Sequence, residues 1–334
     1  MIEKSGRSRR VKIAIMGAGI TGAYLYRLLD AKKQTVDIFD TDTGTTCGIS
    51  PCAWGTSRGF PELVKVSGLD ASKYILERLN HLIMDGLRIT ADLMSIDKRA
   101  LIRDLLQDAR IIHSPPDATQ YDRIIDATGV SRAFLPPLRD DTILPCTQYR
   151  IRADAPLENR IKLGRIGYAW SFPLSSNEYH VGCGSLVSDP QRILKELGWV
   201  GNHRSGMNVL CACSGRIRLT APRYSQPFVA VNGHSEVWGV GEAIGCVAPL
   251  AGDGIIPGMR SVQILMERWD DPAAYTRALL KEFGWMENER RVVDKLRRNE
   301  ALRLSDAWVL KKNSRRMAME VGLKEAATLL RHLR

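Results

Sequence analysis

Apolar and polar residues follow two different periods along the chain, and the change of period divides the sequence. Residues 11–16 form a short apolar run between charged residues and a glycine, a pattern typical of a buried parallel strand. Apolar positions over 20–29 recur at helical spacing, and 35–39 forms a second apolar run. This order predicts a strand, a helix and a second strand, which is the beginning of an α/β unit.

Helical spacing returns twice before residue 110. It predicts helices over 71–84 and over 97–108, the second with Asp97 as its N-cap. Residues 121–127 run into Gly129 and predict another strand. The first part of the chain therefore continues the α/β pattern.

After residue 136 the period shortens to two. Residues 178–186 alternate apolar and polar side chains, and similar short stretches occupy most of 142–231. They predict an antiparallel sheet, interrupted by a helix over 190–197. Residues 236–240 then form a buried strand, which a glycine-rich turn joins to a helix over about 252–269.

This order of elements predicts an α/β protein with three parts. A Rossmann-like lobe is built on a parallel sheet, a mainly antiparallel β-sheet lobe is inserted into it, and the C-terminus is helical. The expected parts are a discontinuous nucleotide-binding domain of 10–60, 97–138 and 232–270, a substrate domain of 61–96 and 139–231, and a C-terminal helical segment of 271–334.

Composition indicates the cellular location of the protein and whether disulfides or metal sites are expected. No apolar run reaches the roughly 18 residues that cross a bilayer, and residues 1–10 lack the apolar centre of a secretory signal. The cytoplasm is therefore the expected location. The seven cysteines are odd in number and include no CxxC pair, so neither a disulfide framework nor a metal site is expected.

The net charge of +11 is concentrated near the C-terminus, where 291–334 carries twelve Lys or Arg against five Asp or Glu. Such a surface fits an anionic membrane, touched peripherally, or an acidic protein partner. A solvated helical face explains the charge equally well. Nucleic acid is not an expected partner, because aromatic residues do not interleave with the basic ones.

Three glycines follow the first predicted strand and open the first predicted helix. In this context Gly17 permits a tight turn, Gly19 lets a diphosphate approach the backbone, and Gly22 lets the helix pack on the strand. Asp40 ends the second strand, where it would accept hydrogen bonds from a ribose. The alternative is a structural turn with a solvated Asp40, and the motif by itself does not distinguish FAD from NAD.

Two later segments place small residues after predicted strands. Asp126-Ala-Thr-Gly129 would let backbone approach a nucleotide, although on its own a plain turn explains it better. Gly241-Glu-Ala-Ile-Gly-Cys-Val-Ala-Pro-Leu-Ala-Gly-Asp-Gly-Ile255 lies between a buried strand and a long helix. Glu242 would bind a ribitol or ribose hydroxyl, and the helix would point its positive end at the ligand.

Together these motifs resemble the geranylgeranyl reductase family of flavoproteins, which belongs with the p-hydroxybenzoate hydroxylase-like folds. Tyr168-Ala-Trp-Ser-Phe-Pro173 resembles the family's YxWxFP motif, and Cys47-Gly48 with Ser50 resembles its Cys-Gly loop near the flavin. The matches extend from residue 11 to about residue 284. The resemblance implies tightly bound FAD, an apolar substrate tunnel, and saturation of isoprenoid double bonds by hydride from flavin N5.

Carried onto this sequence, the resemblance implies roles for the matching residues. Catalytic roles fall to Cys47, Tyr168 and Trp170. Substrate contacts fall to Tyr168, Trp170, Phe172 and Pro173. The implied cofactor-binding residues are Gly17, Gly19, Ile20, Thr21, Gly22, Asp40, Cys47, Gly48, Thr128, Gly129, Gly241, Glu242, Pro249, Gly252, Gly254 and Ile255.

Two of these assignments have alternatives. Tyr168, Trp170 and Phe172 alternate, so they share one face of a strand, where aromatic residues without the resemblance would be sheet core. Cys47 is either a small buried hydrophobe, a redox partner of Cys52, or a group that contacts flavin or donates a proton.

Three functions fit this fold. The first is an FAD-dependent reductase, supplied by NADPH or, given the basic surface, by an acidic carrier such as ferredoxin. The second is a monooxygenase or halogenase, although such halogenases carry WxWxIP where this chain has 168–173. The third is a non-catalytic prenyl carrier like the Rab GDP-dissociation inhibitors, because Glu242 replaces the family's Asp and the chain is short for the family. An intact phosphate turn argues against a carrier.

Overall fold

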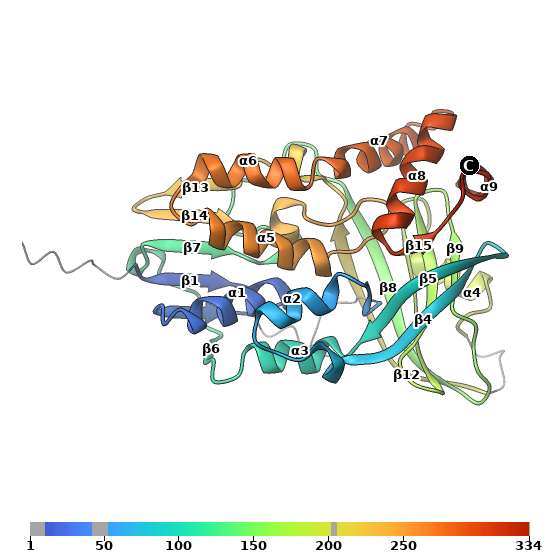
Figure 1. Ribbon diagram of the computed structural model, residues 1–334, viewed down its shortest axis with the longest axis horizontal. Coiled ribbons are helices and arrows are strands. Elements are labelled where there is room, and N and C mark those ends of the chain that lie inside the picture. The colour runs from blue at the N-terminus through green and yellow to red at the C-terminus, as the bar shows by residue number, and fades with distance from the viewer. Residues whose placement is uncertain (1–10, 42–52, 202–205, 334) are drawn as a thin grey trace, which may run out of the picture.

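The described residues form two sheets, and the first is mainly parallel, as expected (Figure 1). The computed structural model describes residues 11–41, 53–201 and 206–333. Among these, β13 pairs antiparallel with β14 at one edge, and the other pairings in the sheet are parallel. In spatial order its strands are β13 (Val229–Asn232), β14 (Ser235–Gly239), β7 (Arg123–Asp126), β1 (Ile13–Met16), β2 (Val36–Phe39) and β6 (Ile111–Ile112).

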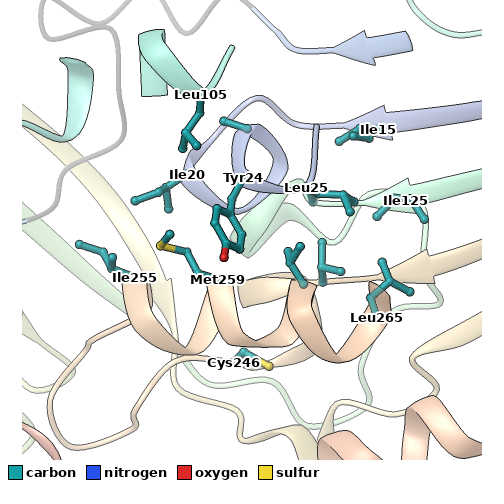
Figure 2. Packing of buried hydrophobic residues seen from close by; sticks show 14 of the residues in the cluster. Ile15, Ile20, Tyr24, Leu25, Leu105, Ile125, Cys246, Ile255, Met259 and Leu265 are labelled. Atoms are coloured by element: carbon teal, nitrogen blue, oxygen red, sulfur yellow. The ribbon is translucent and has the colours of Figure 1, made fainter. Parts of the chain in front are cut away.

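Helix α1 (Ile20–Ala31) follows β1 and packs against α5 (Ile255–Glu267) and α3 (Lys98–Leu105). In Figure 2, Tyr24 of α1 and Met259 of α5 lie side by side in this contact, and both are fully buried. The side chain of Asp97 accepts a hydrogen bond from the N–H of Ala100 at 2.9 Å, which confirms the predicted N-cap of α3. The helices and strands predicted around the first glycine turn are thus confirmed.

The second sheet is antiparallel except where β4 runs parallel to β9. Helix α4 (Pro190–Glu196), predicted over 190–197, packs on β8 and β11. In spatial order the strands are β12 (Met207–Arg218), β8 (Ile143–Ala153), β11 (Glu178–Ser185), β10 (Gly167–Pro173), β9 (Arg160–Leu163), β4 (Ile75–Met84), β5 (Leu87–Ile96) and β15 (Met319–Glu320), and β3 (Gly55–Ser57) also pairs with β5.

The helix predicted over 71–84 is wrong. Only a short 3₁₀ turn, Ala71–Lys73, precedes the ten-residue strand β4, which forms a hairpin with β5. The hairpin turns at Asp85 and Gly86, both with left-handed backbone at φ 48° and 83°. An Asp-Gly pair is the preferred sequence for such a two-residue turn. Cross-strand pairing therefore overrides the helical spacing of the apolar residues.

The C-terminal segment is helical, as predicted, with one exception. The two-residue strand β15 pairs with β5, so this segment also completes an edge of the second sheet. Strand β3, inside the expected nucleotide-binding range 10–60, likewise belongs to the second sheet. Of the described helices none is long and apolar enough to cross a membrane. The remaining helices are α2 (Phe60–Val66), α6 (Pro272–Glu282), α7 (Trp285–Arg297), α8 (Leu304–Arg316) and α9 (Leu323–His332).

Candidate functional site

Gly17 and Gly22 are glycines because the backbone leaves no room for a side chain. Gly17 has φ 104°, and a Cβ there would lie 2.4 Å from the carbonyl oxygen of Ala127. A Cβ at Gly22 would lie 1.9 Å from the carbonyl oxygen of Gly17. These contacts pack the turn and the start of α1 against the end of β7, as the glycine spacing predicted.

Gly19 serves a different purpose. It is the N-cap residue of α1, its φ is −65°, and a Cβ there would meet none of the described residues within 4 Å. The first N–H groups of a helix have no intrahelical acceptor, and no side chain in the described ranges caps α1. Open space above Gly19 and uncapped N–H groups at Ile20 and Thr21 fit a diphosphate.

Asp40 lies beside this turn. Its carboxylate accepts hydrogen bonds from the N–H of Ala18 at 3.2 Å and from the N–H of Thr41 at 2.9 Å. The side chain is half-buried, and each oxygen keeps a second lone pair. Asp40 is thus held at the end of β2 with capacity for further hydrogen bonds, which fits the predicted ribose contact.

Asp126 fixes the loop that follows β7. The fully buried carboxylate accepts hydrogen bonds from the N–H and hydroxyl of Thr128 at 3.1 and 2.6 Å, and from the N–H groups of Phe134 and Leu135 at 2.9 and 3.0 Å. The Thr128 hydroxyl is committed to this network. A cofactor contact at Thr128 or Gly129 would therefore use backbone atoms.

Thr21 joins α1 to the two later glycine segments. A Cβ at Gly241, whose φ is 63°, would lie 2.7 Å from Thr21 Oγ1, and a Cβ at Gly258 of α5 would lie 2.5 Å from the same atom. The N–H of Gly241 donates to Ser261 Oγ at 2.9 Å. The turn before α1, the turn after β14 and helix α5 therefore meet at one place.

Glu242 lies between two other elements of this junction. Its Oε1 accepts a hydrogen bond from the N–H of Arg218 at 2.7 Å, and its Oε2 is 3.5 Å from the Cβ position of Gly129. Burial raises the pKa of this carboxyl. The Arg218 guanidinium is held by Asp141 at 2.9 Å. The longer side chain of Glu242 is thus accommodated by a contact with β12.

The loop before α5 contains a carboxyl group that the sequence analysis overlooked. Asp253 lies between Gly252, which has φ 65°, and Gly254, the N-cap residue of α5. Its side chain accepts a hydrogen bond from the N–H of Ile255 at 3.0 Å. Burial raises the pKa of Asp253 to about 6. The sequence predicted that the positive N-terminal end of this helix would face a ligand. In the structure the carboxyl group of Asp253 occupies part of that end. An Asp two residues before a helix was the available signal.

The aromatic residues of β10 face this loop. The hydroxyl of Tyr168 donates a hydrogen bond to the carbonyl oxygen of Ala251, and the Tyr168 and Trp170 rings lie 5.7 Å apart. Trp170 and Phe172 belong to one buried cluster, whereas Ala169 belongs to the cluster on the opposite face. The predicted alternation of Tyr168, Trp170 and Phe172 is thus confirmed, and Pro173 ends the strand.

Cys47 and Gly48 lie outside the described residues. Shortly after them in the sequence, the Trp54 ring packs edge-on against the His180 ring at 4.6 Å. Gly55 lies beside Phe172, because a Cβ there would be 3.3 Å from Phe172 Cε2. Pro249 and Ile255, two further predicted cofactor residues, are both buried. Among the described residues, no three His, Cys, Asp or Glu residues gather as a metal site.

Known proteins resemble the chain at the level of sequence and fold. No protein-family model matches it. An uncharacterized protein of Methanocaldococcus jannaschii is 23% identical over 337 residues, which cover 85% of this chain and 91% of that protein. Menaquinone reductase of Mycolicibacterium smegmatis is 28% identical over 131 residues, which cover 33% of this chain and 28% of that protein.

Solved structures match nearly the whole fold. A geranylgeranyl bacteriochlorophyll reductase-like protein from Thermoplasma acidophilum has a TM-score of 0.69 at 15% identity, over 96% of this chain and 95% of that one. A flavin-dependent halogenase from Xanthomonas campestris has a TM-score of 0.65 at 13% identity, over 97% and 94%. The chain therefore has the Rossmann-type flavoprotein fold that the sequence resemblance implied.

Proposed function

We propose that this chain binds FAD where the first glycine turn, the turn after β14 and the start of α5 meet. The open backbone at Gly19 and the uncapped start of α1 would receive the diphosphate. Asp40 would bind the ribose, and Glu242 a hydroxyl of the ribitol. Gly19 fits the cofactor, because it has no side chain at the position that the diphosphate would occupy.

The proposed activity is reduction of carbon–carbon double bonds in an isoprenoid-type substrate. Once reduced by NADPH or by an acidic electron carrier, bound FAD would supply two electrons as hydride from N5. The observation that carries this proposal is the hydrogen bond from Tyr168 to Ala251, which joins the aromatic face of β10 to the proposed flavin loop. The names of the Thermoplasma structure and of menaquinone reductase, a partial match, support a reductase.

A flavin monooxygenase or halogenase is the second candidate, because a halogenase shares the fold. The chain has Tyr168-Ala-Trp-Ser-Phe-Pro173 where halogenases of this fold have WxWxIP. A monooxygenase would consume NADPH and form a flavin hydroperoxide, so oxygen reactivity of the reduced protein separates the two. A non-catalytic prenyl carrier is the third candidate, and the preserved space above Gly19 argues against it.

The first test is the visible absorption spectrum of the purified protein, with identification of the cofactor released on denaturation. We expect a flavin spectrum and free FAD. A colourless protein that also fails to bind added FAD would overturn the proposal. A Trp170→Ala variant should keep FAD but slow the reoxidation of reduced protein by a prenylated substrate, because the ring lies next to Tyr168.

The C-terminal charge suggests where the protein acts. Helix α8 exposes Leu304 and Trp308, at 67% and 50% of their areas, together with Lys312 and Arg315 on the same face. Apolar side chains beside basic ones are typical of helices that lie on anionic membranes. We propose a cytoplasmic protein that touches the membrane through α8, with NADPH or an acidic electron carrier as reductant.

A further inference from the structure

Helix α8, which packs against α7, buries polar residues and exposes large apolar ones (Figure 1). Amphipathic helices typically do the reverse. Asp306 Oδ1 accepts a hydrogen bond from Lys295 Nζ of α7 at 2.8 Å, while Leu304 and Trp308 lie exposed. The buried residues of α8 are Asp306, Ala307, Asn313 and Ser314. Directional polar contacts therefore help to hold α8 against α7.

Asn313 connects α8 to a fully buried carboxyl group of α7. Asn313 Nδ2 donates a hydrogen bond to Glu289 Oε1 at 2.9 Å, and Arg316 Nη1 lies 3.7 Å from the same oxygen. The Arg316 guanidinium also lies over the Trp285 ring of α7, 4.3 Å from its centroid. Two side chains of α8 therefore converge on one oxygen of Glu289.

The other oxygen of Glu289 faces the loop that leads into α5. Glu289 Oε2 accepts a hydrogen bond from the N–H of Leu250 at 3.4 Å. The next two N–H groups, those of Ala251 and Gly252, turn back to the carbonyl oxygen of Ala248 at 3.2 and 2.8 Å. The N–H of Leu250 thus points out of a tight turn toward α7. Glu289 links the C-terminal helices to the proposed flavin loop.

The exposed side of α8 is the side proposed to touch the membrane. Helical geometry places Trp308, together with Leu304, Lys312 and Arg315, opposite Asn313. A helix on an anionic membrane sinks its apolar side chains about 5–10 Å into the headgroup region. Seating α8 this deeply draws it away from α7, and a hydrogen bond weakens steeply once its geometry is disturbed. Contact with lipid therefore opposes the hydrogen bond of Asn313.

We infer that α8 is a membrane-responsive helix, and that its contact with an anionic lipid surface is transmitted through Asn313 and Glu289 to the proposed flavin loop. The inference rests on the proposed function and adds regulation to its cofactor site. In the docked position of α8, both oxygens of Glu289 are hydrogen-bonded and the loop is held for FAD. Glu289 is thus a positioning residue, which acts on FAD through Leu250.

Withdrawal of α8 changes this arrangement. Glu289 loses the hydrogen bond from Asn313, and a buried carboxyl group without its partner turns toward the water that enters behind the helix. Leu250 then loses its acceptor, and the loop binds FAD less tightly. Because lipid and FAD favour different positions of α8, each weakens the binding of the other by the same factor.

The test measures both sides of this linkage. FAD affinity is titrated by fluorescence with and without phosphatidylglycerol vesicles, and vesicle affinity is measured by co-sedimentation with and without bound FAD. We expect each ligand to weaken the other at least about fivefold, and by equal factors. Unchanged FAD affinity on vesicles, or absence of vesicle binding, would overturn the inference. Protein that binds vesicles but takes up no FAD in buffer would overturn the proposed function itself, and the inference with it.

Asn313→Ala should reproduce the withdrawn state. It should bind FAD at least about fivefold more weakly in buffer, still bind vesicles, and show no further loss of FAD affinity on them. Simple repulsion between lipid and the phosphates of FAD would act on this variant too. Ser314→Ala is the matched control, because this buried hydroxyl of α8 donates to Leu310 O within the helix at 2.9 Å. The control should behave as the unmodified protein. An equal effect of vesicles on Asn313→Ala would refute the route through Glu289.

Discussion

The hydroxyl of Tyr168, on the second sheet, donates a hydrogen bond to the backbone oxygen of Ala251, in the loop that leads into α5. This bond ties the aromatic face of β10 to the glycine segment proposed to hold the flavin. A Cβ at Gly252, the next residue, would be 3.4 Å from the same hydroxyl. The second sheet is thus hydrogen-bonded directly to the loop that leads into α5.

We predict that Tyr168→Phe lowers both the stability of the protein and its affinity for FAD. A lost hydrogen bond of this kind costs about 1 kcal/mol. Tyr149→Phe is the matched control, because its hydroxyl accepts from Gln191 Nε2 at 2.7 Å on the opposite face of the sheet. The control should lose similar stability, measured by denaturant titration, but keep its FAD affinity. Equal FAD affinity in all three proteins would contradict the prediction.

Alanine substitutions at Gly19 and Gly22 should have different effects, the first on FAD binding and the second on folding. The new methyl group of Gly19→Ala meets no described atom within 4 Å, and the residue keeps an ordinary φ of −65°, so the variant should fold with unchanged thermal stability. Its methyl group would occupy the diphosphate position and weaken FAD binding about tenfold or more. Gly22→Ala should yield little folded protein, because its Cβ would lie 1.9 Å from Gly17 O.

Fluorescence titration of FAD and circular dichroism would measure these two effects. Gly164→Ala provides the control, because its Cβ would make only ordinary contacts, at 3.5 Å and beyond, in the loop between β9 and β10. A Gly19→Ala protein that binds FAD normally would show that the diphosphate does not lie against this turn.

Glu289 should make stability depend on pH. This fully buried carboxyl of α7 accepts hydrogen bonds from Asn313 Nδ2 at 2.9 Å and from the N–H of Leu250 at 3.4 Å. Burial raises its pKa from 4.5 to about 7. The folded state therefore binds the proton more tightly than the unfolded state, so this stabilisation is complete below pH 4.5 and is lost as pH rises through about 7.

Glu289→Gln should remove that dependence. The melting temperature of the wild-type protein should fall relative to the variant between pH 5 and pH 8, because the variant has no charge to bury. Glu320→Gln, a change at an exposed position of β15, should follow the wild type. A constant difference between wild type and Glu289→Gln across this range would show that Glu289 keeps its ordinary pKa.

Helix α8 should determine membrane binding. Trp308→Glu and Leu304→Glu should each reduce co-sedimentation with phosphatidylglycerol vesicles at least about fivefold, because each replaces an exposed apolar side chain with a negative charge. Neutral phosphatidylcholine vesicles and high salt should weaken binding of the unmodified protein. Val231→Glu, at a 76% exposed position of β13, is the control. Equal binding by all variants would exclude α8 as the contact.

The first sheet was predicted well from the sequence, because the sequence signals for its strands and turns are local. A fully buried strand such as β1 is a continuous apolar run, and the spacing of the glycines after it is a recognisable strand-to-helix motif. Strand β4 was misassigned because its apolar residues fit a helix, while two register shifts against β5 disturb its alternation. The Asp85-Gly86 turn was the signal that could have corrected this.

The candidate site was predictable only where a motif carries it. Gly17, Gly241 and the aromatic residues of β10 lie in recognisable patterns. The contact between Tyr168 and Ala251 does not, because the two residues lie 83 positions apart and meet only when the second sheet packs against the loop before α5. No local pattern reports a contact of that range.

Strands β7 and β14 are neighbours, with Asp126 opposite Gly239, although more than a hundred residues separate them in the chain. At a translation rate of about 5–20 residues per second, β7 is synthesised roughly 5–20 s before its neighbour β14. Most of the second sheet is synthesised in that interval. The edge of β7 that pairs with β14 therefore has its backbone N–H and C=O groups unpaired while a different part of the protein is being made.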